Sequence, residues 1–524
     1  MKKPIVLVLF LSSFHVCYGL KILNIFPTIS KSHNILGDGI NRHLLNAGHE
    51  VTYITAFVKN NTHPKLRQID VTSNFDMVPE ERLSLSQFQA SSSSSNVGHI
   101  LMMVGLYMMT RWTVLNENVQ KLLHDPNEHF DVVIADWSVT EITFSGIAKL
   151  YDAPLIWATT LEPHWLAMKY IDDVLSPAYC SDIMSPKVAP FTFWERASEL
   201  WTQIKVTFYK EIILHFFDWQ LYSNEIAPLI KERGMEPPCG EELKYNSSLI
   251  IGNSHVSFGE AHRLPVNYIA VGGYHIDDNV KPLTGDLKNV MDNAKHGVIY
   301  FSMGSLIKSK DLTEDVKQAL LDMFGKLKQT VIWKFEEDRT NLPDNVHMVK
   351  WAPQQSILAH PNCVLFITHG GLLSTTESIH YGVPVIGIPV FVDQFNNIDR
   401  AVSKGFAKKV NLVMLPTLAD DLKGAIDEVL GDPKYKEKVK QLSFIFHHRP
   451  AKPGDELVHW VEHVVMTRGA PHMRSPALLV PWYQKMYLDL LAFVILIIFA
   501  VRYLYRNYLK DILFKTSGSK KKTN

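Results

Sequence analysis

Short apolar segments typical of buried strands alternate with helical segments along most of this chain, and no other feature restricts its fold as strongly. Between the first two expected strands, apolar residues recur at helical spacing from Ile35 to Leu45, and Gly48 ends that helix. Strand, helix and strand in this order form a βαβ unit, so the sequence predicts a doubly wound parallel sheet. The expected strands of this first set are Lys21–Phe26, Val51–Thr55, Asp131–Asp136, Pro154–Ala158 and Leu249–Gly252.

A second alternating set follows a short linker near His275–Pro282. The chain has 524 residues, which is too many for one core, so we expect two α/β domains. A cleft between two domains is the usual place for a ligand. A helix is expected over Leu312–Leu327, and the expected strands are Gly297–Ser302, Thr330–Phe335, Val346–Trp351, Val364–Thr368 and Pro384–Ile388.

Both ends of the chain carry patterns typical of membrane targeting. Residues 1–19 contain two lysines, an apolar stretch and small residues before a cleavage point, which indicates a secretory signal peptide; a short buried strand is the alternative. Residues 486–505 would make about 30 Å of apolar helix, enough to span a bilayer; a buried core helix is the alternative. Basic residues follow this span, so the 506–524 tail is expected in the cytosol.

This orientation predicts a type I protein whose body is lumenal and whose only anchor is the C-terminal helix. The last four residues, Lys521 to Asn524, resemble the dilysine signal of endoplasmic reticulum membrane proteins, although a lysine-rich tail can also be solubilising charge. Two glycosylation sequons, Asn60-Asn61-Thr62 and Asn246-Ser247-Ser248, agree with a lumenal body.

Composition excludes some classes of partner. Lys plus Arg and Asp plus Glu are equal at 53 each, so no overall positive field recruits nucleic acid. The mature chain keeps Cys180, Cys239 and Cys363, which do not make a disulfide framework. Three cysteines allow one disulfide bridge and require none. The sequence does not decide the oligomeric state, and a homo-oligomer stays open.

The segment Phe366–Gln394 breaks at His369-Gly370-Gly371, where an expected strand ends and a helix should begin. The first turn of a helix has free N–H groups and a positive dipole end, which attract phosphate, and glycines let the phosphate approach closely. An ordinary strand-to-helix turn with a core histidine is the alternative. The glycine patterns of dinucleotide oxidoreductases and P-loop proteins are absent from the sequence.

The same segment resembles the signature of the UDP-glycosyltransferases. It reads F-I-T-H-G-G and continues with the expected serine, glutamate, two prolines and Asp-Gln. Upstream, Trp351–Gln355 is similar to the family's W-x-P-Q segment, and Phe301–Ser305 is similar to its F-S-x-G-S turn. Downstream, His459–Met486 resembles the segment before the membrane anchor of the animal branch, which includes vertebrate UDP-glucuronosyltransferases and insect UDP-glucosyltransferases.

The resemblance implies a GT-B fold, in which two Rossmann-like doubly wound domains face a cleft. Residues 20–275 would form the acceptor-binding domain and residues 283–445 the UDP-sugar-binding domain. Residues 446–485 would return the chain to the membrane helix. UDP-sugar would be a co-substrate, and the family's fold usually works without a metal; the sequence offers no Asp-x-Asp placed to hold a divalent ion.

The resemblance also implies roles for the nucleotide and the sugar. Trp351 would stack on the uracil ring, Gln354 would bond the nucleotide, and the Glu377 carboxylate would accept both ribose hydroxyls. Asp393 and Gln394, just past the next strand, would hold the hydroxyls of the transferred sugar.

The diphosphate would be held by Ser305, His369 and Gly371, with the hydroxyl of Ser374 nearby. One departure from the family's pattern falls in this region. Vertebrate relatives carry Asn at the position of Leu373, so one polar contact to the diphosphate is absent here.

Two residues of the N-terminal half match the family's catalytic pair. His33 stands where the family's base stands, and Asp136, 103 residues later at the end of an expected strand, matches its carboxylate partner. Histidine suits the deprotonation of an acceptor hydroxyl because its pKa lies near neutrality. Attack opposite the leaving UDP would invert the anomeric carbon.

The expected activity is transfer of a hexose, preferably glucose, from a UDP-sugar to a small lipophilic hydroxyl compound. UDP-glucuronic acid is the alternative donor. The Phe-, Trp- and Met-rich region from about Met102 to Phe217 is expected to make the acceptor pocket. A non-catalytic lumenal carrier of apolar molecules and a single-pass receptor are the alternatives from other classes.

Overall fold

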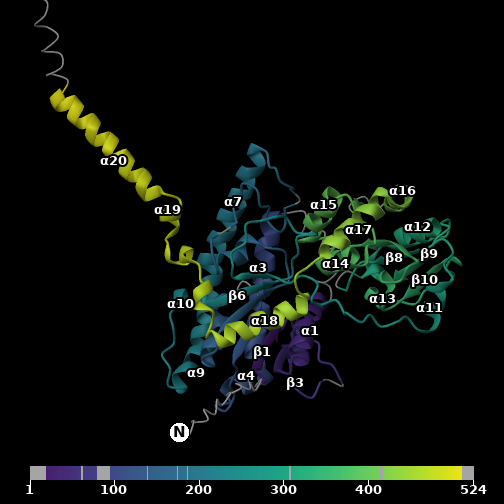
Figure 1. The fold of residues 1–524 in the computed structure, drawn as a ribbon, viewed down its shortest axis with the longest axis horizontal. Coiled ribbons are helices and arrows are strands. Elements are labelled where there is room, and N and C mark those ends of the chain that lie inside the picture. Colours follow the sequence, from purple (N-terminus) through teal and green to yellow (C-terminus); the bar gives the residue numbers. More distant parts are fainter. Residues whose placement is uncertain are drawn as a thin grey trace, which may run out of the picture. The chain divides into compact units, whose positions relative to one another are not determined.

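A computed structural model describes residues 19–60, 63–78, 95–137, 140–173, 175–185, 187–305, 308–412 and 417–509 (Figure 1). The chain divides into two compact units, one ending at Met473 and the other beginning at Arg474. The predicted signal peptide up to residue 18, the Asn61-Thr62 part of one sequon and the dilysine tail lie outside the described residues.

The first unit contains two parallel sheets, which confirms the predicted pair of Rossmann-like folds. The sheet of the N-terminal half has the order β3-β2-β1-β4-β5-β6-β7. Alternate side chains of β1 enter different cores, because Leu23 and Ile25 pack on one face of the sheet and Ile22 and Phe26 on the other. The strands are β1 Lys21–Phe26, β2 Glu50–Thr55, β3 Leu66–Asp70, β4 Val132–Asp136, β5 Leu155–Thr159, β6 Ser247–Gly252 and β7 Tyr268–Ala270.

The sheet of the C-terminal half has the order β10-β9-β8-β11-β12-β13, and its paired strands are also parallel. Its central strand β11 pairs with β8 and β12, so the turns that follow these strands meet at one edge of the sheet. The strands are β8 Val298–Ser302, β9 Thr330–Lys334, β10 Val346–Val349, β11 Cys363–Thr368, β12 Val385–Gly387 and β13 Ala407–Lys409.

Helices cover both sheets. The first of them begins at Lys31, four residues before the apolar periodicity, and therefore includes His33. The helices of the N-terminal half are α1 Lys31–Asn46, α3 Ser95–Leu115, α4 Glu117–His124, α5 Glu141–Leu150, α6 Trp165–Met168, α7 Phe193–Tyr209, α8 His215–Leu221, α9 Ala227–Glu232 and α10 Gly240–Lys244. Those that follow are α11 Gly285–Asp292, α12 Glu314–Phe324, α13 Gln354–Leu358, α14 Leu372–Tyr381, α15 Gln394–Ser403, α16 Leu418–Gly431 and α17 Lys434–His447.

The chain then returns to the N-terminal half through α18, Pro453–Met466. This helix packs on α1, and its buried Leu457, Val461 and Val464 join Ile40 and Leu44 of α1 in one apolar cluster (Figure 1). The two halves are thus held together by the linker and by this returning helix.

The second unit contains α19, Trp482–Lys485, and α20, Leu488–Leu504, which continues as a wider helical turn over Tyr505–Leu509. Residues 488–507 form the one described helix long and apolar enough to cross a membrane, with a mean hydropathy of 2.2 and none of it buried. Among the described cysteines Cys180, Cys239 and Cys363, none forms a disulfide.

Candidate active site

A histidine and an aspartate meet at the carboxyl edge of the first sheet. His33 lies in the first turn of α1, just after β1, and Asp136 is the last residue of β4. Because β1 and β4 are neighbours in the sheet, these two positions lie side by side although they are far apart in sequence. The distance between His33 Nδ1 and Asp136 Oδ2 is 2.6 Å. Asp136 is buried, whereas the His33 side chain keeps 26% of its surface exposed.

The surroundings of His33 favour its charged form. Burial would lower the pKa of His33, but the charge of Asp136 and the hydrogen bond to it outweigh burial, and the charge of Asp393 adds to them, so the pKa is raised above 6.5. The other ring nitrogen, Nε2, lies 3.4 Å from the hydroxyl of Thr160, which follows β5. One ring nitrogen of His33 therefore contacts a carboxylate, and the other does not.

The turns after β8 and β11 meet around the ring of His369. A Cβ on Gly304 would lie 2.5 Å from that ring, and a Cβ on Gly371 would lie 2.6 Å from its Nε2 atom. Gly304 also has a φ of +87°, which side-chain-bearing residues rarely adopt. The glycines of both turns are thus required by the close approach of the imidazole.

Burial lowers the pKa of His369 to about 4, with a smaller contribution from the charge of Lys334. The ring is therefore neutral near pH 7 and can donate one N–H. The Thr368 hydroxyl lies 3.4 Å from Nδ1, so a proton on Nε2 is the tautomer that lets both ring nitrogens be used. Gly371 precedes α14 as its N-cap residue, and no side chain caps this helix.

A buried carboxylate lies further along α14. Glu377 accepts hydrogen bonds from Gln354 Nε2 at 2.6 Å and from Gln355 Nε2 at 3.3 Å, and Gln354 also donates to the Ser374 hydroxyl. His275, from the segment that links the halves, lies 3.5 Å from the same carboxylate. The predicted nucleotide residues Gln354, Ser374 and Glu377 therefore form one polar cluster.

Two other predicted donor residues lie in more open positions. Trp351 follows β10 with 62% of its surface exposed, and Lys334 Nζ lies 6.0 Å from its ring centroid. Such an exposed indole face is available for stacking. Ser305 is exposed in the turn after β8, next to Gly304.

Asp393 and Gln394 lie at the start of α15, after β12. Asp393 Oδ2 accepts a hydrogen bond from Asn397 at 2.8 Å, and burial raises the pKa of Asp393 above its ordinary value. Gln394 Oε1 accepts hydrogen bonds from the main-chain N–H groups of Val390 and Phe391, which fixes the orientation of its amide.

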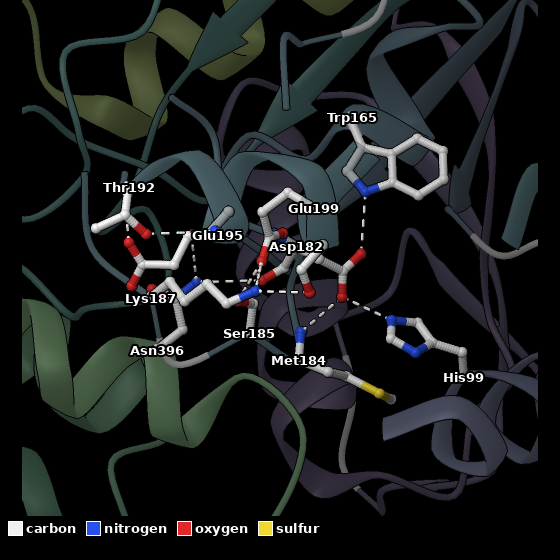
Figure 2. A network of polar contacts seen from close by, with 12 residues as sticks. His99, Trp165, Asp182, Met184, Ser185, Lys187, Thr192, Glu195, Glu199 and Asn396 are labelled. Carbon is white, nitrogen blue, oxygen red and sulfur yellow. Dashed lines mark hydrogen bonds and ion pairs between the residues drawn. The ribbon is translucent and has the colours of Figure 1, made fainter. Parts of the chain in front are cut away.

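The first turn of α15 also contacts the N-terminal half. The Asn396 amide donates to the Ser181 hydroxyl at 3.1 Å. It also lies 3.5 Å from the main-chain oxygen of Asp182 (Figure 2). The charge of Asp393 contributes to the raised pKa of His33, which indicates that the start of α15 lies on the same side as the catalytic candidates of the N-terminal half.

Comparison with known proteins agrees with this arrangement. The pattern of the family described as "UDP-glucoronosyl and UDP-glucosyl transferase" matches residues 21–523. The chain belongs to the UDP-glycosyltransferase family. This glycosyltransferase is 30% identical to UDP-glucosyltransferase 2 of Dactylopius coccus over 99% of both chains. It is also 30% identical to human UDP-glucuronosyltransferase 2B7 over 87% of both chains.

Solved structures support the fold of the glycosyltransferase. The calicheamicin glycosyltransferase CalG4 covers 87% of this chain and is itself covered completely, with a TM-score of 0.54 and 16% identity. The spinosyn forosaminyltransferase SpnP covers 85% of this chain, with 99% of SpnP covered, a TM-score of 0.55 and 15% identity. The predicted GT-B architecture is confirmed by these likenesses.

Sequence reasoning missed several residues that the glycosyltransferase places around the site. Thr160 follows β5, the strand beside β4, which ends in Asp136. Its place just after a parallel strand could have indicated Thr160 as a site residue. Gln355 bonds both Glu377 and the main chain of Asp277, and His275 faces the same carboxylate. Leu373, by contrast, was already singled out from the sequence, and its side chain packs against the apolar cluster of the N-terminal half.

Proposed function

We propose that this enzyme transfers glucose from UDP-glucose to a hydroxyl of a small lipophilic acceptor, with inversion of the anomeric carbon. The observation that carries the proposal is the contact of 2.6 Å between His33 Nδ1 and Asp136 Oδ2 at the carboxyl edge of the first sheet. A base positioned by a carboxylate, opposite a helix that binds anions, is what displacement of UDP by an alcohol requires.

In the proposed reaction, His33 Nε2 takes the proton from the acceptor hydroxyl. The Nδ1–H of the same ring donates to Asp136 and steadies the imidazolium that forms. The acceptor oxygen forms a bond to the anomeric carbon while the bond from that carbon to the UDP oxygen breaks. The leaving diphosphate would be held by Ser305, by the neutral His369 and by the N–H groups that follow Gly371.

The remaining donor contacts follow from the polar clusters. Trp351 stacks on uracil, and Glu377 accepts hydrogen bonds from the ribose hydroxyls. Gln354 gives up its hydrogen bond to Glu377 and donates to the nucleotide instead. Asp393 accepts hydrogen bonds from the sugar, and Gln394, whose Oε1 is already used, donates from its amide nitrogen.

Glucose is proposed rather than glucuronic acid because the amide of Gln394, whose Oε1 is already held by the main-chain N–H of Val390, suits the neutral hydroxyls of glucose. Full-length enzyme in membranes should be assayed with UDP-glucose, UDP-glucuronic acid and other UDP-hexoses against phenolic acceptors. We expect kcat/KM to be highest for UDP-glucose. A preference for UDP-glucuronic acid would overturn the sugar assignment while keeping the mechanism.

Replacing Trp351 with Ala should raise the KM for the UDP-sugar by about 10- to 100-fold, because base stacking on an aromatic contributes about 1–3 kcal/mol. Steady-state kinetics with the donor varied measures this effect. Trp351→Phe, which keeps an aromatic face, serves as the control and should retain most of the affinity. An unchanged KM in Trp351→Ala would remove this residue from the donor site.

The pH dependence of kcat/KM should report the protonation of His33. The base acts only when neutral, so activity should fall as pH decreases through the raised pKa, which lies above 6.5. UDP affinity should stay constant over the same range, because His369 remains neutral above about pH 4. A fall in UDP affinity that parallels the loss of activity would assign the decrease of kcat/KM at low pH to donor binding instead.

Removal of divalent metal should leave the reaction rate unchanged. Among the described residues, no group of three or more His, Cys, Asp or Glu side chains is placed to bind a metal ion. The experiment compares initial rates before and after dialysis against a chelator. A loss of activity that returns with Mg²⁺ or Mn²⁺ would contradict donor activation by protein groups alone.

We propose that α20 anchors the enzyme in the endoplasmic reticulum membrane as a type I protein with the catalytic part in the lumen. The hydropathy of residues 488–507 and the basic residues after this helix support the proposal. Protease treatment of sealed microsomes should spare the catalytic part and remove only the short tail. Complete digestion without detergent would show that the catalytic part faces the cytosol and would contradict the proposed orientation.

A further inference from the structure

Two histidine rings meet at the end of the first unit. His463 lies in the last turn of α18, and His472 lies in the short 3₁₀ helix Pro471–Met473 that follows it. The Nε2 atoms of the two rings are 3.1 Å apart, and the ring planes make an angle of 79°. Because protons on both nitrogens would collide at this distance, at least one Nε2 atom presents a free lone pair to the other ring.

The turn between the two helices fixes this geometry. Residues 468–470 all have positive φ values, which bend the chain back toward α18. The Thr467 hydroxyl donates to the main-chain oxygen of His463 at 2.6 Å. Met473, next to His472, is buried in the apolar cluster that α1 and α18 share. The two imidazoles are therefore brought together by the backbone and by packing, and not by their own contact.

The spacing of the two nitrogens fits a shared metal ion. Histidine nitrogens bind zinc at about 2.0–2.1 Å, so two ligands of one ion lie about 2.9–3.4 Å apart for bond angles from about 90° to about 110°. The observed 3.1 Å lies inside this range. Neutral imidazole is a preferred ligand of zinc, copper and nickel ions. A simple hydrogen bond from one ring to the other is the alternative and needs no ion.

The other coordination positions of such an ion are open. Among the described residues, no third His, Cys, Asp or Glu side chain already completes a group around the pair. Glu462, next to His463 in sequence, pairs with His49 at 3.1 Å instead. His459 precedes His463 by one helical turn, a spacing that zinc sites on helices use, and the centroids of these two rings lie 6.1 Å apart. Water therefore completes the coordination, and His459 joins only if its ring rotates.

We propose that His463 and His472 bind a divalent transition-metal ion of the zinc type through their Nε2 atoms. The ion clips the end of the first unit onto α18, the helix that packs on α1. None of the catalytic or donor-binding candidates belongs to this pair. Binding of the ion should therefore change the stability of this segment and leave the reaction rate unchanged.

The test measures metal protection of single histidines in the full-length enzyme in detergent, after treatment with a chelator. Diethyl pyrocarbonate modifies accessible neutral imidazoles, and mass spectrometry of the digested protein reports each position. At a Zn²⁺ concentration about 100 times the dissociation constant, only about 1% of the sites stay free, so modification of His463 and His472 should fall by about 100-fold. The exposed His296 should not be protected. Mg²⁺, which prefers oxygen ligands, should protect none of them.

His472→Ala is the decisive variant, because it removes one nitrogen from an exposed position and leaves α18 intact. In this variant Zn²⁺ should no longer protect His463, and in His463→Ala it should no longer protect His472. Zn²⁺ should raise the unfolding midpoint of the parent enzyme and of His296→Ala, but not that of the two site variants. A midpoint without metal that matches the parent enzyme shows that each variant is folded.

Two results would overturn the proposal. Absence of Zn²⁺ protection at both positions would leave only a hydrogen bond between two rings. Protection of His463 that persists in His472→Ala would show that the ion has other ligands. Protection of His459 in addition to the pair would support the proposal and add His459 as a third ligand.

Discussion

His33→Ala should lower kcat by about 10²- to 10⁴-fold, which is the usual contribution of a general base. The loss follows from removal of Nε2, the ring nitrogen of His33 that does not contact the Asp136 carboxylate. Steady-state rates with UDP-glucose and a phenolic acceptor measure the effect. Calorimetric titration should show UDP affinity within about twofold of the parent enzyme, because the donor residues lie in the other half of the first unit.

Thr160→Ala is the matched control for this experiment. Its hydroxyl lies 3.4 Å from His33 Nε2, a weak contact at best, so its removal should change kcat by less than about tenfold. If His33→Ala kept full activity, the base would have to be another group. If it lost activity and UDP affinity together, the variant would be reporting damage to the fold.

Asp136→Asn should lower kcat by about 10³- to 10⁴-fold although it preserves the size of the side chain. An amide nitrogen facing His33 Nδ1 would donate to it and thereby place the ring proton on Nε2, so the nitrogen that must accept a proton would already carry one. Loss of the carboxylate charge also removes the main contribution that raises the pKa of His33.

The residual activity of Asp136→Asn should therefore show a changed pH dependence. The acid limb of kcat/KM should move to lower pH than in the parent enzyme, because burial then lowers the pKa of His33 with less opposition. Asp136→Glu tests the need for a carboxylate at this distance and should recover part of the rate. A wild-type rate in Asp136→Asn would reduce Asp136 to a packing role.

The central strands of both sheets could be predicted because they are buried on both faces and read as continuous apolar runs. The edge strands β3, β7 and β13 were missed. The segment β3 alternates polar residues at a sheet edge, and β7 and β13 span three residues each, so none produces a long apolar signal. The α7 to α8 segment also escaped prediction, because its apolar side faces outward and the turn at Lys210–Leu214 interrupts the helical period.

The catalytic pair was predictable only through the family resemblance, because His33 is otherwise one of 23 histidines. Asp136 and His369 stand at strand ends, whereas His33 and Asp393 lie where the next helix begins. Contacts between the halves were not predictable, because they depend on how two separately folded sheets meet. The hydrogen bond from Asn396 to Ser181 joins residues 215 positions apart, and neither belongs to a recognisable motif.

The most direct test of this account is the anomeric configuration of the product formed from UDP-glucose, in which the glucose is α-linked, and a phenolic acceptor. The product should be isolated from the full-length enzyme in membranes and its anomeric proton coupling measured by NMR. Direct displacement of UDP by an oxygen that His33 deprotonates predicts a β-glucoside. An α-glucoside, or the absence of transfer from every UDP-hexose tested, would contradict it.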